Sequence, residues 1–166
     1  LGDTYDDAVF EQVFALNTRS VPRLCSAAHP HLRQSKNGFV ILVGSVAGRN
    51  GGATGSGIYA ATKASVHSLT RSLAKEYAQD GIRVNAVIVA ECYTPMYENW
   101  IKTLPHPEEA LEEINNRIPL GNRMTTVEEI ANTVAFLLSK RSSHTTGQFI
   151  HVDGGYVHLD RSLLKK

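Results

Sequence analysis

Ile82-Arg-Val-Asn-Ala-Val-Ile-Val89 is the stretch that decides the fold. Apart from two polar residues it is apolar, and β-branched side chains dominate, which is typical of a strand buried on both faces of a parallel sheet. Upstream, Phe39-Val-Ile-Leu-Val43 has the same character, and Gly147-Gln-Phe-Ile-His-Val152 follows downstream. The sequence therefore predicts three buried strands, separated by long segments of a different pattern.

The segments that flank these strands are helical in pattern. Apolar residues recur at helical spacing over 6–32, where Pro22 is expected to introduce a kink, and over 58–79, which Gly81 ends. A further helix is predicted over 125–138, with acidic residues in its first turn. This alternation predicts an α/β fold with a Rossmann-like, doubly wound parallel sheet covered on both faces. Three strands are few for such a sheet, and ligands bind beyond the carboxyl ends of its strands.

The composition is that of one globular domain, residues 1–166. Apolar residues make up 42% and charged residues 20%, which excludes a disordered tail or a coiled coil. The net charge of +1 predicts no nucleic-acid partner, and no apolar run is long enough to span a membrane. The polar segment 94–119 is predicted to form a lid over a small-molecule substrate. We interpret Cys25 and Cys92 as free thiols of a cytoplasmic protein, because the first residues show no secretion signal.

Tyr59-Ala-Ala-Thr-Lys63 carries the strongest chemical signal. Residues four apart lie on one face of a helix, so the phenol and the ammonium group are expected side by side. The ammonium group and the positive end of the helix favour the phenolate, and the tyrosine can then exchange a proton with an alcohol or a carbonyl. Alone the motif is weak, because a lysine that packs its stem on a half-buried tyrosine gives the same pattern.

Two further polar residues strengthen this interpretation. Ser45 directly follows the first strand, where its hydroxyl would donate to a substrate oxygen while Tyr59 handles the proton; a turn serine bonded to local backbone is the alternative. Asn17 lies inside the first predicted helix, where asparagine is unfavourable. It would kink the helix and hold a water that leads to Lys63, and a solvent-facing asparagine is the alternative.

In order and spacing, this series resembles the short-chain dehydrogenase/reductase family. The residues that carry the resemblance are Asn17, Ser45-x-Ala-Gly48, Tyr59-x-x-x-Lys63, Gly81-Ile-Arg-Val-Asn85 and Gly147-Gln…Val-Asp153-Gly-Gly155. The resemblance implies an enzyme that moves a hydride between an alcohol carbon and NAD or NADP. It implies that Tyr59 is the general acid/base and that Ser45 polarises the substrate oxygen. Lys63 would support the phenolate and bind the nicotinamide ribose, and Asn17 would hold a proton-relay water.

A narrower resemblance points to sugar dehydrogenases of the L-fucose dehydrogenase type. The stretches that carry it are Val87-Ile-Val-Ala-Glu91 through Thr94-Pro-Met, Ile118-Pro-Leu-Gly121, Arg123-Met-Thr-Thr126 and His151-Val-Asp-Gly-Gly-Tyr-Val-His-Leu-Asp-Arg161. By position, Val89, Cys92 and Thr94 would line the nicotinamide and pyrophosphate, although Val89-Ala90 stands where the family usually has Pro-Gly. The implied partners are a sugar or other small alcohol and further copies of the chain, in a homodimer or homotetramer.

The N-terminal half of the family's fold has no counterpart in this sequence. Members begin with a strand, a Thr-Gly-x-x-x-Gly-x-Gly turn and a residue that reads the adenosine ribose and so selects NAD or NADP. We therefore expect only the C-terminal strands and helices of the sheet, with the N-terminal βαβ half missing. A truncated, non-catalytic remnant that serves as an oligomerisation module is the alternative function.

Other sequence features have competing interpretations. Gly51-Gly-Ala-Thr-Gly55-Ser-Gly57 matches a dinucleotide fingerprint, but Gly44 to Asn50 separate it from the first strand, whereas the true motif turns directly after its strand. Ser45 and Lys63 would make a hydrolytic dyad, but no Gly-x-Ser-x-Gly elbow surrounds the serine.

The histidines and the lid aromatics are weaker signals still. His29 and His31 share a turn, but no acidic partner is evident beside them, and no metal site is expected among the seven histidines. Tyr97 and Trp100 in the lid would either stack on a sugar ring or pack the lid closed.

Overall fold

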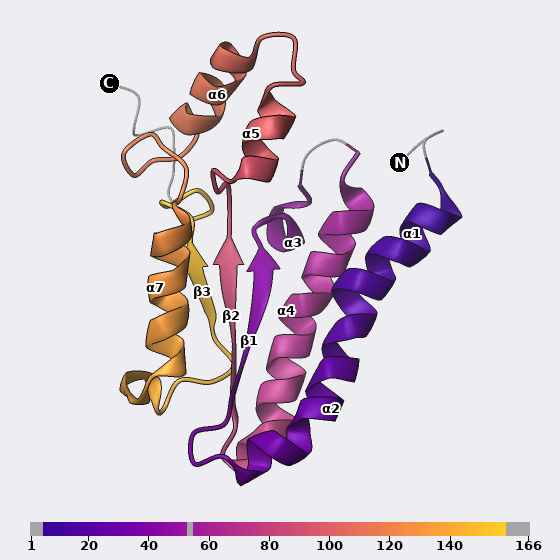
Figure 1. The fold of residues 1–166 in the computed structure, drawn as a ribbon, viewed down its shortest axis with the longest axis vertical. Coiled ribbons are helices and arrows are strands. Elements are labelled where there is room, and N and C mark those ends of the chain that lie inside the picture. The colour runs from indigo at the N-terminus through magenta and orange to yellow at the C-terminus, as the bar shows by residue number, and fades with distance from the viewer. Residues whose placement is uncertain (1–4, 53–54, 159–166) are drawn as a thin grey trace.

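The computed structural model describes residues 5–52 and 55–158 of the 166-residue chain (Figure 1). Its helices are α1 (Asp7–Phe14), α2 (Ser20–Gln34), α3 (Ala47–Asn50), α4 (Gly57–Tyr77), α5 (Pro95–Ile101), α6 (Pro107–Asn116) and α7 (Val127–Leu138). Its strands are β1 (Phe39–Ser45), β2 (Arg83–Val89) and β3 (Phe149–Val152). A π-helical turn, Ala15–Arg19, joins α1 to α2, and short 3₁₀ turns follow α4 and α7 at Ala78–Asp80 and Lys140–Ser142.

The three strands form one parallel sheet in the order β1-β2-β3, which confirms the predicted α/β fold. The register aligns their carboxyl ends, because Ser45 pairs with Val89 and Val89 pairs with Val152. In Figure 1 the three arrows point the same way, and α5 and α6 lie beyond their tips. The sheet therefore brings the last residues of three distant segments to one edge.

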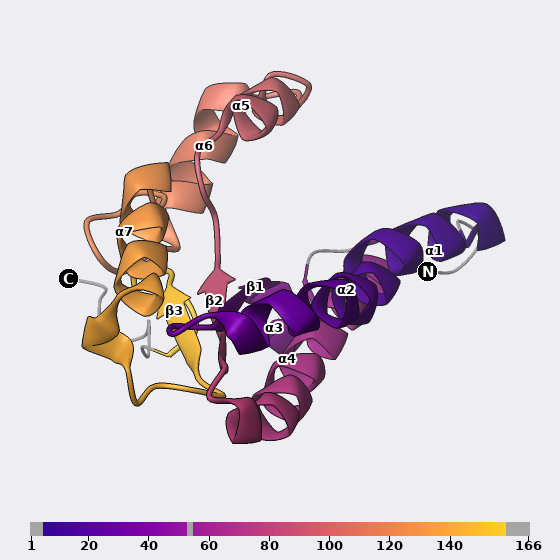
Figure 2. The ribbon, with the colours of Figure 1, turned by 60° about the horizontal axis from the view of Figure 1, so that its bottom comes forward.

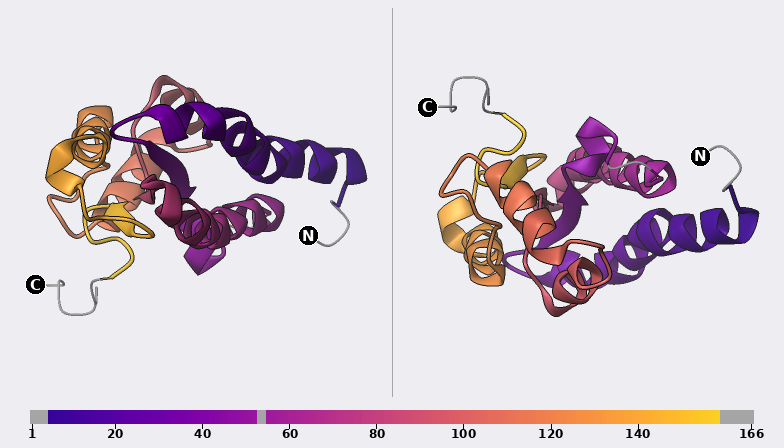
Figure 3. Two further views of the ribbon diagram at one scale, coloured as in Figure 1. Left: turned by 90° about the horizontal axis from the view of Figure 1, so that it is seen from below. Right: turned by 90° about the horizontal axis from the view of Figure 1, so that it is seen from above.

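Helices cover the two faces of the sheet to different extents. In Figure 3, α7 stands on one side and α4 with α2 on the other. The side facing α4 holds the main core, to which β2 contributes Val84, Ala86 and Ile88, all fully buried. The prediction that the first strand is buried on both faces is wrong at Val43, whose side chain is 57% exposed. It faces the side of α7, which packs more extensively on β2 than on β1.

The predicted helix over 6–32 is interrupted. The break is the π-helical turn Ala15–Arg19, which lies just before Pro22 rather than at it. A proline ring clashes with the carbonyl four residues earlier, here that of Thr18, and a widened turn around this carbonyl relieves the clash. The sequence therefore predicted a distortion correctly, and the structure places it one turn earlier with Asn17 at its centre.

Local signals set the remaining boundaries. Gly81, with φ of 70°, closes the 3₁₀ turn after α4, and Thr126 with Glu129 forms a capping box at the start of α7. The segment 44–57, expected to be a loop, contains the short helix α3. The lid segment 94–119 folds as α5 and α6, which stand away from the sheet in Figure 2. Within the described residues, no helix is long and apolar enough to cross a membrane.

Candidate active site

Ser45 is the last residue of β1, and backbone bonds hold it at the sheet edge. The Val46 amide donates to the Val89 carbonyl at 3.0 Å, which ties the two strand ends together. The Ser45 Oγ accepts a hydrogen bond from the Ala47 amide at 3.2 Å, at the start of α3. Because this bond uses the oxygen as an acceptor, the hydroxyl proton remains available to another acceptor.

Tyr59 and Lys63 lie on one face of α4, as their spacing predicts. The Lys63 Nζ donates to the Val43 carbonyl at 3.0 Å and lies 5.7 Å from the centre of the Tyr59 ring. Burial lowers the pKa of Lys63. Tyr59 is 40% exposed, so its phenol faces open space while the lysine behind it is anchored to β1.

Gly48 explains why α3 can pack so closely against this pair. A β-carbon on Gly48 would lie 2.6 Å from the Lys63 carbonyl carbon and 2.7 Å from its oxygen. These are backbone atoms that cannot turn aside, so only glycine allows the contact. The Ser-x-Ala-Gly stretch therefore joins Ser45, at the end of β1, to a short helix that packs directly on the backbone of Lys63.

Asn17 is half-buried at the centre of the π-helical turn. That turn packs on α4, and the Thr18 Oγ1 lies 2.8 Å from the Ser65 Oγ, two residues beyond Lys63. Single π-turns inside helices are rare and occur often at functional sites. The fold thus brings Asn17 to the helix that carries Lys63, and its role in holding a water stays a prediction.

A cavity of about 670 Å³ opens at the carboxyl edge of the sheet. Four of the predicted site residues line it, namely Ser45, Tyr59, Cys92 and Thr94. Val89, Lys63 and Asn17 are not among its lining residues. Val89 ends β2 directly beneath the cavity, and its neighbours Ala90 and Glu91 line the wall in its place.

Sequence reasoning missed several residues of this cavity. Glu91 comes from the loop after β2, Tyr97 from α5, Arg117 from the end of α6 and Tyr156 from beyond β3. The predicted parallel sheet was a usable signal for Glu91, because residues that directly follow a strand gather at this edge. Tyr97 was singled out only as a lid aromatic, and no local pattern places Tyr97, Arg117 or Tyr156 at this cavity; the path of the lid segment and of the chain after β3 brings them there.

The residues present fit the nicotinamide end of a dinucleotide cofactor. The chain from Ala90 to Thr94 forms one wall of the cavity and is held by a bridge between Cys92 and Thr125. Thr94 then caps α5, its hydroxyl accepting from the Tyr97 amide at 3.2 Å. This wall lies directly beyond the carboxyl end of β2, where open α/β sheets bind dinucleotides.

The glycine-rich run 51–57 is not placed as a phosphate-binding turn. The helix α3 separates it from β1, whereas a dinucleotide fingerprint turns directly from strand to helix. Its residues Ala53 and Thr54 lie outside the described part of the chain. The geometry agrees with the argument from sequence spacing against this motif.

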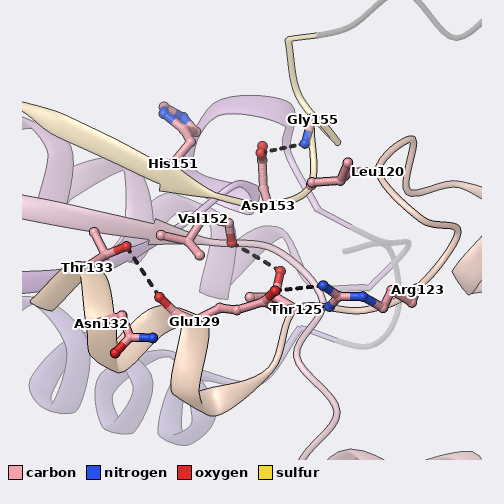
Figure 4. Close-up of a pocket in the computed structure, with 11 residues that line it drawn as sticks. Leu120, Arg123, Thr125, Glu129, Asn132, Thr133, His151, Val152, Asp153 and Gly155 are labelled. Carbon is pink, nitrogen blue, oxygen red and sulfur yellow. Dashed lines mark hydrogen bonds and ion pairs between the residues drawn. The ribbon is translucent and has the colours of Figure 1, made fainter.

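A second cavity, of about 570 Å³, lies between α7 and the end of β3 (Figure 4). It contains none of the predicted catalytic or cofactor-binding residues. Its polar side chains serve structure: Arg123 pairs with Glu129 at 2.6 Å, and the Thr125 hydroxyl donates to the Val152 carbonyl at 3.3 Å. We therefore assign the candidate active site to the cavity that holds Ser45 and Tyr59.

The structure corrects one expectation about the histidines. A carboxylate does lie beside His29, whose Nε2 is 2.9 Å from Asp80 Oδ2, and Arg33 pairs with the other oxygen at 3.1 Å. This contact joins α2 to the turn after α4. Among residues 5–52 and 55–158, no group of three or more side chains is arranged to hold a metal ion. Cys25 and Cys92 are both free thiols.

The parallel sheet and its flanking helices are those of a known family of oxidoreductases. The chain matches, over residues 2–157, the short-chain dehydrogenase family model described as enoyl-(acyl carrier protein) reductase. The chain therefore belongs to the short-chain dehydrogenase/reductase family.

Curated relatives support this assignment. A tropinone reductase homologue of Arabidopsis thaliana is 39% identical over 154 residues, which cover 92% of this chain and 55% of the relative. The 3-oxoacyl-[acyl-carrier-protein] reductase of Thermotoga maritima is 40% identical over 148 residues, which cover 89% of this chain and 57% of the relative. The chain thus spans about half the length of the curated relatives it matches.

Solved structures show the same fold. The Cj0485 dehydrogenase superposes with a TM-score of 0.92 at 39% identity, over 99% of this chain and 63% of that one. An NADH-dependent reductase of alginate metabolism gives 0.80 at 35% identity, over 95% and 59% of the two chains. A gluconate 5-dehydrogenase from Burkholderia cenocepacia, in complex with NADP and tartrate, gives 0.84 at 25% identity, over 95% and 60%.

Proposed function

We propose that this chain carries the catalytic part of an NAD(P)-dependent dehydrogenase that oxidises a secondary alcohol of a small sugar such as L-fucose, or reduces the corresponding carbonyl. The observation that carries the proposal is that Ser45 and Tyr59 line one cavity, with the Lys63 Nζ held 5.7 Å from the tyrosine ring. A hydroxyl donor, a phenol and an ammonium group in this arrangement can hold an oxygen and move its proton.

Each residue has a separate task in this proposal. The Ser45 hydroxyl donates to the substrate oxygen and fixes its position, and the Tyr59 Oη takes the hydroxyl proton in the oxidising direction. The Lys63 ammonium group stabilises the resulting phenolate. A water held at Asn17 would pass the proton onward from Lys63 toward solvent. In the reducing direction each proton moves the opposite way.

The cofactor would occupy the wall formed by Val89, Cys92 and Thr94, with its ribose near Tyr59 and Lys63. When bound, NAD or NADP supplies the acceptor for the hydride that leaves the alcohol carbon. The choice between NAD and NADP depends on contacts to the adenosine ribose, which family members make with their N-terminal half. The relatives include both an NADH-dependent reductase and an NADP complex, so either cofactor is compatible with the family.

A sugar is our preferred substrate because of the stretches that resemble L-fucose dehydrogenases and the polar lining of the cavity. The named relatives act on varied carbonyl compounds, and a gluconate 5-dehydrogenase is among the similar structures. We place the protein in the cytoplasm, where the free thiols of Cys25 and Cys92 stay reduced.

The direct test is oxidation of L-fucose with NAD⁺ or NADP⁺, followed by nicotinamide absorbance, in the parent chain and in Tyr59→Phe. Loss of a positioned acid/base is expected to lower the rate by about 10²- to 10⁴-fold. Tyr59 is partly exposed, so the thermal unfolding midpoint should change little. Tyr5→Phe, at an exposed tyrosine just before α1, is the matched control. A near-normal rate in Tyr59→Phe would remove this residue as the acid/base.

A second function, association without catalysis, is favoured by one observation. Leu16 in the π-helical turn and Leu24 in α2 are 70% and 69% exposed. Exposed apolar side chains of this size suit contact with further copies of the chain in a homodimer or homotetramer. Sedimentation measures the assembly, and titration with NADH or NADPH, followed by nicotinamide fluorescence, measures cofactor binding. Assembly with neither cofactor bound would favour the oligomerisation module over the enzyme.

A further inference from the structure

The cavity that holds Ser45 and Tyr59 contains a carboxylate for which the proposed chemistry has no use. Glu91 lines the wall directly after β2, two residues beyond the strand end that faces Ser45. It is half-buried, and its backbone carbonyl accepts from the Thr125 amide at 3.1 Å, which fixes the loop. A charge held at this place is costly unless a ligand or a neighbour compensates it.

Tyr97 provides part of that compensation. Its phenol donates a hydrogen bond to the Glu91 carboxylate, and burial together with this carboxylate raises the pKa of Tyr97, so the phenol stays a donor. The Tyr97 ring packs edge-on against Trp100, with ring centres 5.2 Å apart. In the structure the two lid aromatics therefore pack on each other.

Glu91 keeps acceptor capacity after it has bonded Tyr97. An ionised carboxylate has about four lone-pair sites, and the phenol uses one of them. Arg117 stands at the rim of the same cavity, paired with Glu113 one helical turn earlier, and Asn50 lies on the wall formed by α3. The wall therefore presents acceptors and donors side by side.

This mixture discriminates between classes of ligand. A neutral polyhydroxylated molecule can donate to Glu91 and accept from Arg117 at once. An apolar acyl chain would leave the carboxylate desolvated without a donor. Sites built to bond a hydroxyl reject analogues that lack it far more strongly than apolar pockets reject an extra group.

We infer that Glu91, positioned by Tyr97, is a specificity-determining residue that accepts hydrogen bonds from substrate hydroxyls next to the reacting carbon, which makes a neutral polyol or sugar the substrate class. The inference rests on the proposed function, because it needs the substrate to lie between Glu91 and the Ser45–Tyr59 pair. Tyr97 is a positioning residue that acts through Glu91.

The experiment compares L-fucose with cyclohexanol, a secondary alcohol that has no second hydroxyl. Glu91→Gln is expected to lower kcat/KM for L-fucose by about ten- to a hundredfold, mostly through KM, since a charged hydrogen bond is lost. For cyclohexanol the change should stay within about threefold, because that alcohol makes no bond to Glu91. Tyr97→Phe should raise KM for L-fucose and leave kcat nearly unchanged.

Glu98→Gln is the matched control, because this α5 carboxylate pairs with Lys102 and is not among the residues that line the cavity. It should leave both substrates unaffected. Equal loss on L-fucose and cyclohexanol in Glu91→Gln, or no loss on either, would overturn the inference. The inference would also be overturned if the enzyme converted an acyl ketone or an amino ketone in preference to the sugar.

A binding measurement separates this inference from the proposed function. Saturation-transfer NMR of L-fucose on the Tyr59→Phe variant, with and without Glu91→Gln, reports sugar binding where turnover is blocked. Binding that depends on Glu91 supports the substrate class even if the parent chain transfers no hydride. If turnover depends on Tyr59 but Glu91→Gln leaves sugar binding unchanged, the proposed function still holds and Glu91 has no part in sugar recognition.

Discussion

Arg83 and Asn85, near the amino end of β2, are buried with their side chains bonded to the protein, whereas Ser45 and Tyr59, beyond the carboxyl ends, face a cavity. The Arg83 Nη1 donates to the Leu137 carbonyl at 2.9 Å and to the Ser142 hydroxyl at 2.8 Å. The Asn85 amide donates to the Thr145 carbonyl at 2.8 Å and accepts from the Gln148 amide at 3.0 Å. Polar groups at the amino end of the sheet join elements together, whereas those at the carboxyl end line a cavity.

The polar groups at the two ends of β2 differ in what they do: those at the amino end stabilise the fold, and those at the carboxyl end are left unused by it. Arg83 has carbonyl and hydroxyl acceptors at the C-terminal end of α7, where the helix dipole favours a cation. These bonds fix α7 to β2, and α7 in turn holds the loop opposite Cys92 through its capping box and the neighbouring Thr125. The rigid amino end therefore supports the geometry of the reactive end. Substitutions at the two ends should affect different measurements.

Among the substitutions at the two ends of the sheet, Ser45→Ala should have the largest effect, a loss of activity. Loss of one hydroxyl that holds the substrate oxygen is expected to lower kcat by about 10²- to 10³-fold. Stability should change little, because the hydroxyl bonds only the nearby Ala47 amide. Steady-state kinetics and thermal unfolding measure the two effects, with Ser68→Ala on the exposed face of α4 as the control. If Ser45→Ala lost stability as well as activity, stability and reaction would not be served by separate ends of the sheet.

Arg83→Met should show the reverse pattern. The substitution removes three buried hydrogen bonds from a charged group, to the Leu137 carbonyl, the Ser142 carbonyl and the Ser142 hydroxyl, which should lower the free energy of unfolding by about 2–3 kcal/mol. Below the unfolding transition, kcat should stay within about threefold of the parent, since no group in the cavity is changed. Urea denaturation measures the loss. Arg71→Met, at an exposed arginine over the Phe149 ring, is the control and should have a much smaller effect.

Lys63→Met tests the link between the buried cation and the phenol. Without the positive charge near the Tyr59 ring, transfer of the substrate proton should be disfavoured by the equivalent of about one to two pH units, the order of magnitude expected for a nearby unit charge in a partly buried site. The pH profile of alcohol oxidation should move to the alkaline side by this amount. Lys75→Met, in the exposed last turn of α4, serves for comparison. An unshifted profile with intact activity would show that Lys63 has no part in the proton transfer.

Glu129→Gln should produce the smallest effect, on stability alone. Bonds from Arg123 and from the Thr126 amide lower the pKa of the Glu129 carboxyl from 4.5 to about 2. Because the pKa is lower in the folded state, the stabilisation is complete above about 4.5 and is lost as the pH falls toward about 2. The difference in unfolding midpoint between parent and Glu129→Gln should therefore be largest near neutral pH and vanish in strong acid. Glu128→Gln in the same turn should not show this dependence; if it does, the general helix dipole is the cause.

The sequence predicted most of the secondary structure and the placement of Lys63 beside Tyr59 because those features are local. Gly81 ends a helix by its own positive φ, Thr126 caps one through a residue three positions later, and Tyr59 and Lys63 share a face by helical spacing. The apolar run of β2 is buried as predicted. In each case the cause and its effect lie within a few residues of each other.

Other features depend on distant partners. The exposure of Val43 reflects how far α7 extends over the sheet, and the contact between His29 and Asp80 joins residues separated by most of the first half of the chain. The helix is distorted at Asn17, where the sequence predicted a kink, but neither Asn17 nor Pro22 indicated that the distortion would be a π-helical turn.

By itself the sequence determined that a tyrosine, a lysine and a strand-end serine would lie near one sheet edge, because parallel strands align their carboxyl ends and helices align residues four apart. Only the tertiary structure decided that Glu91, Tyr97 and Arg117 join them around one cavity. These three come from a strand end and two lid helices, and no periodicity relates them. Their meeting depends on the three-dimensional path of the lid segment, which packing rather than local preference sets.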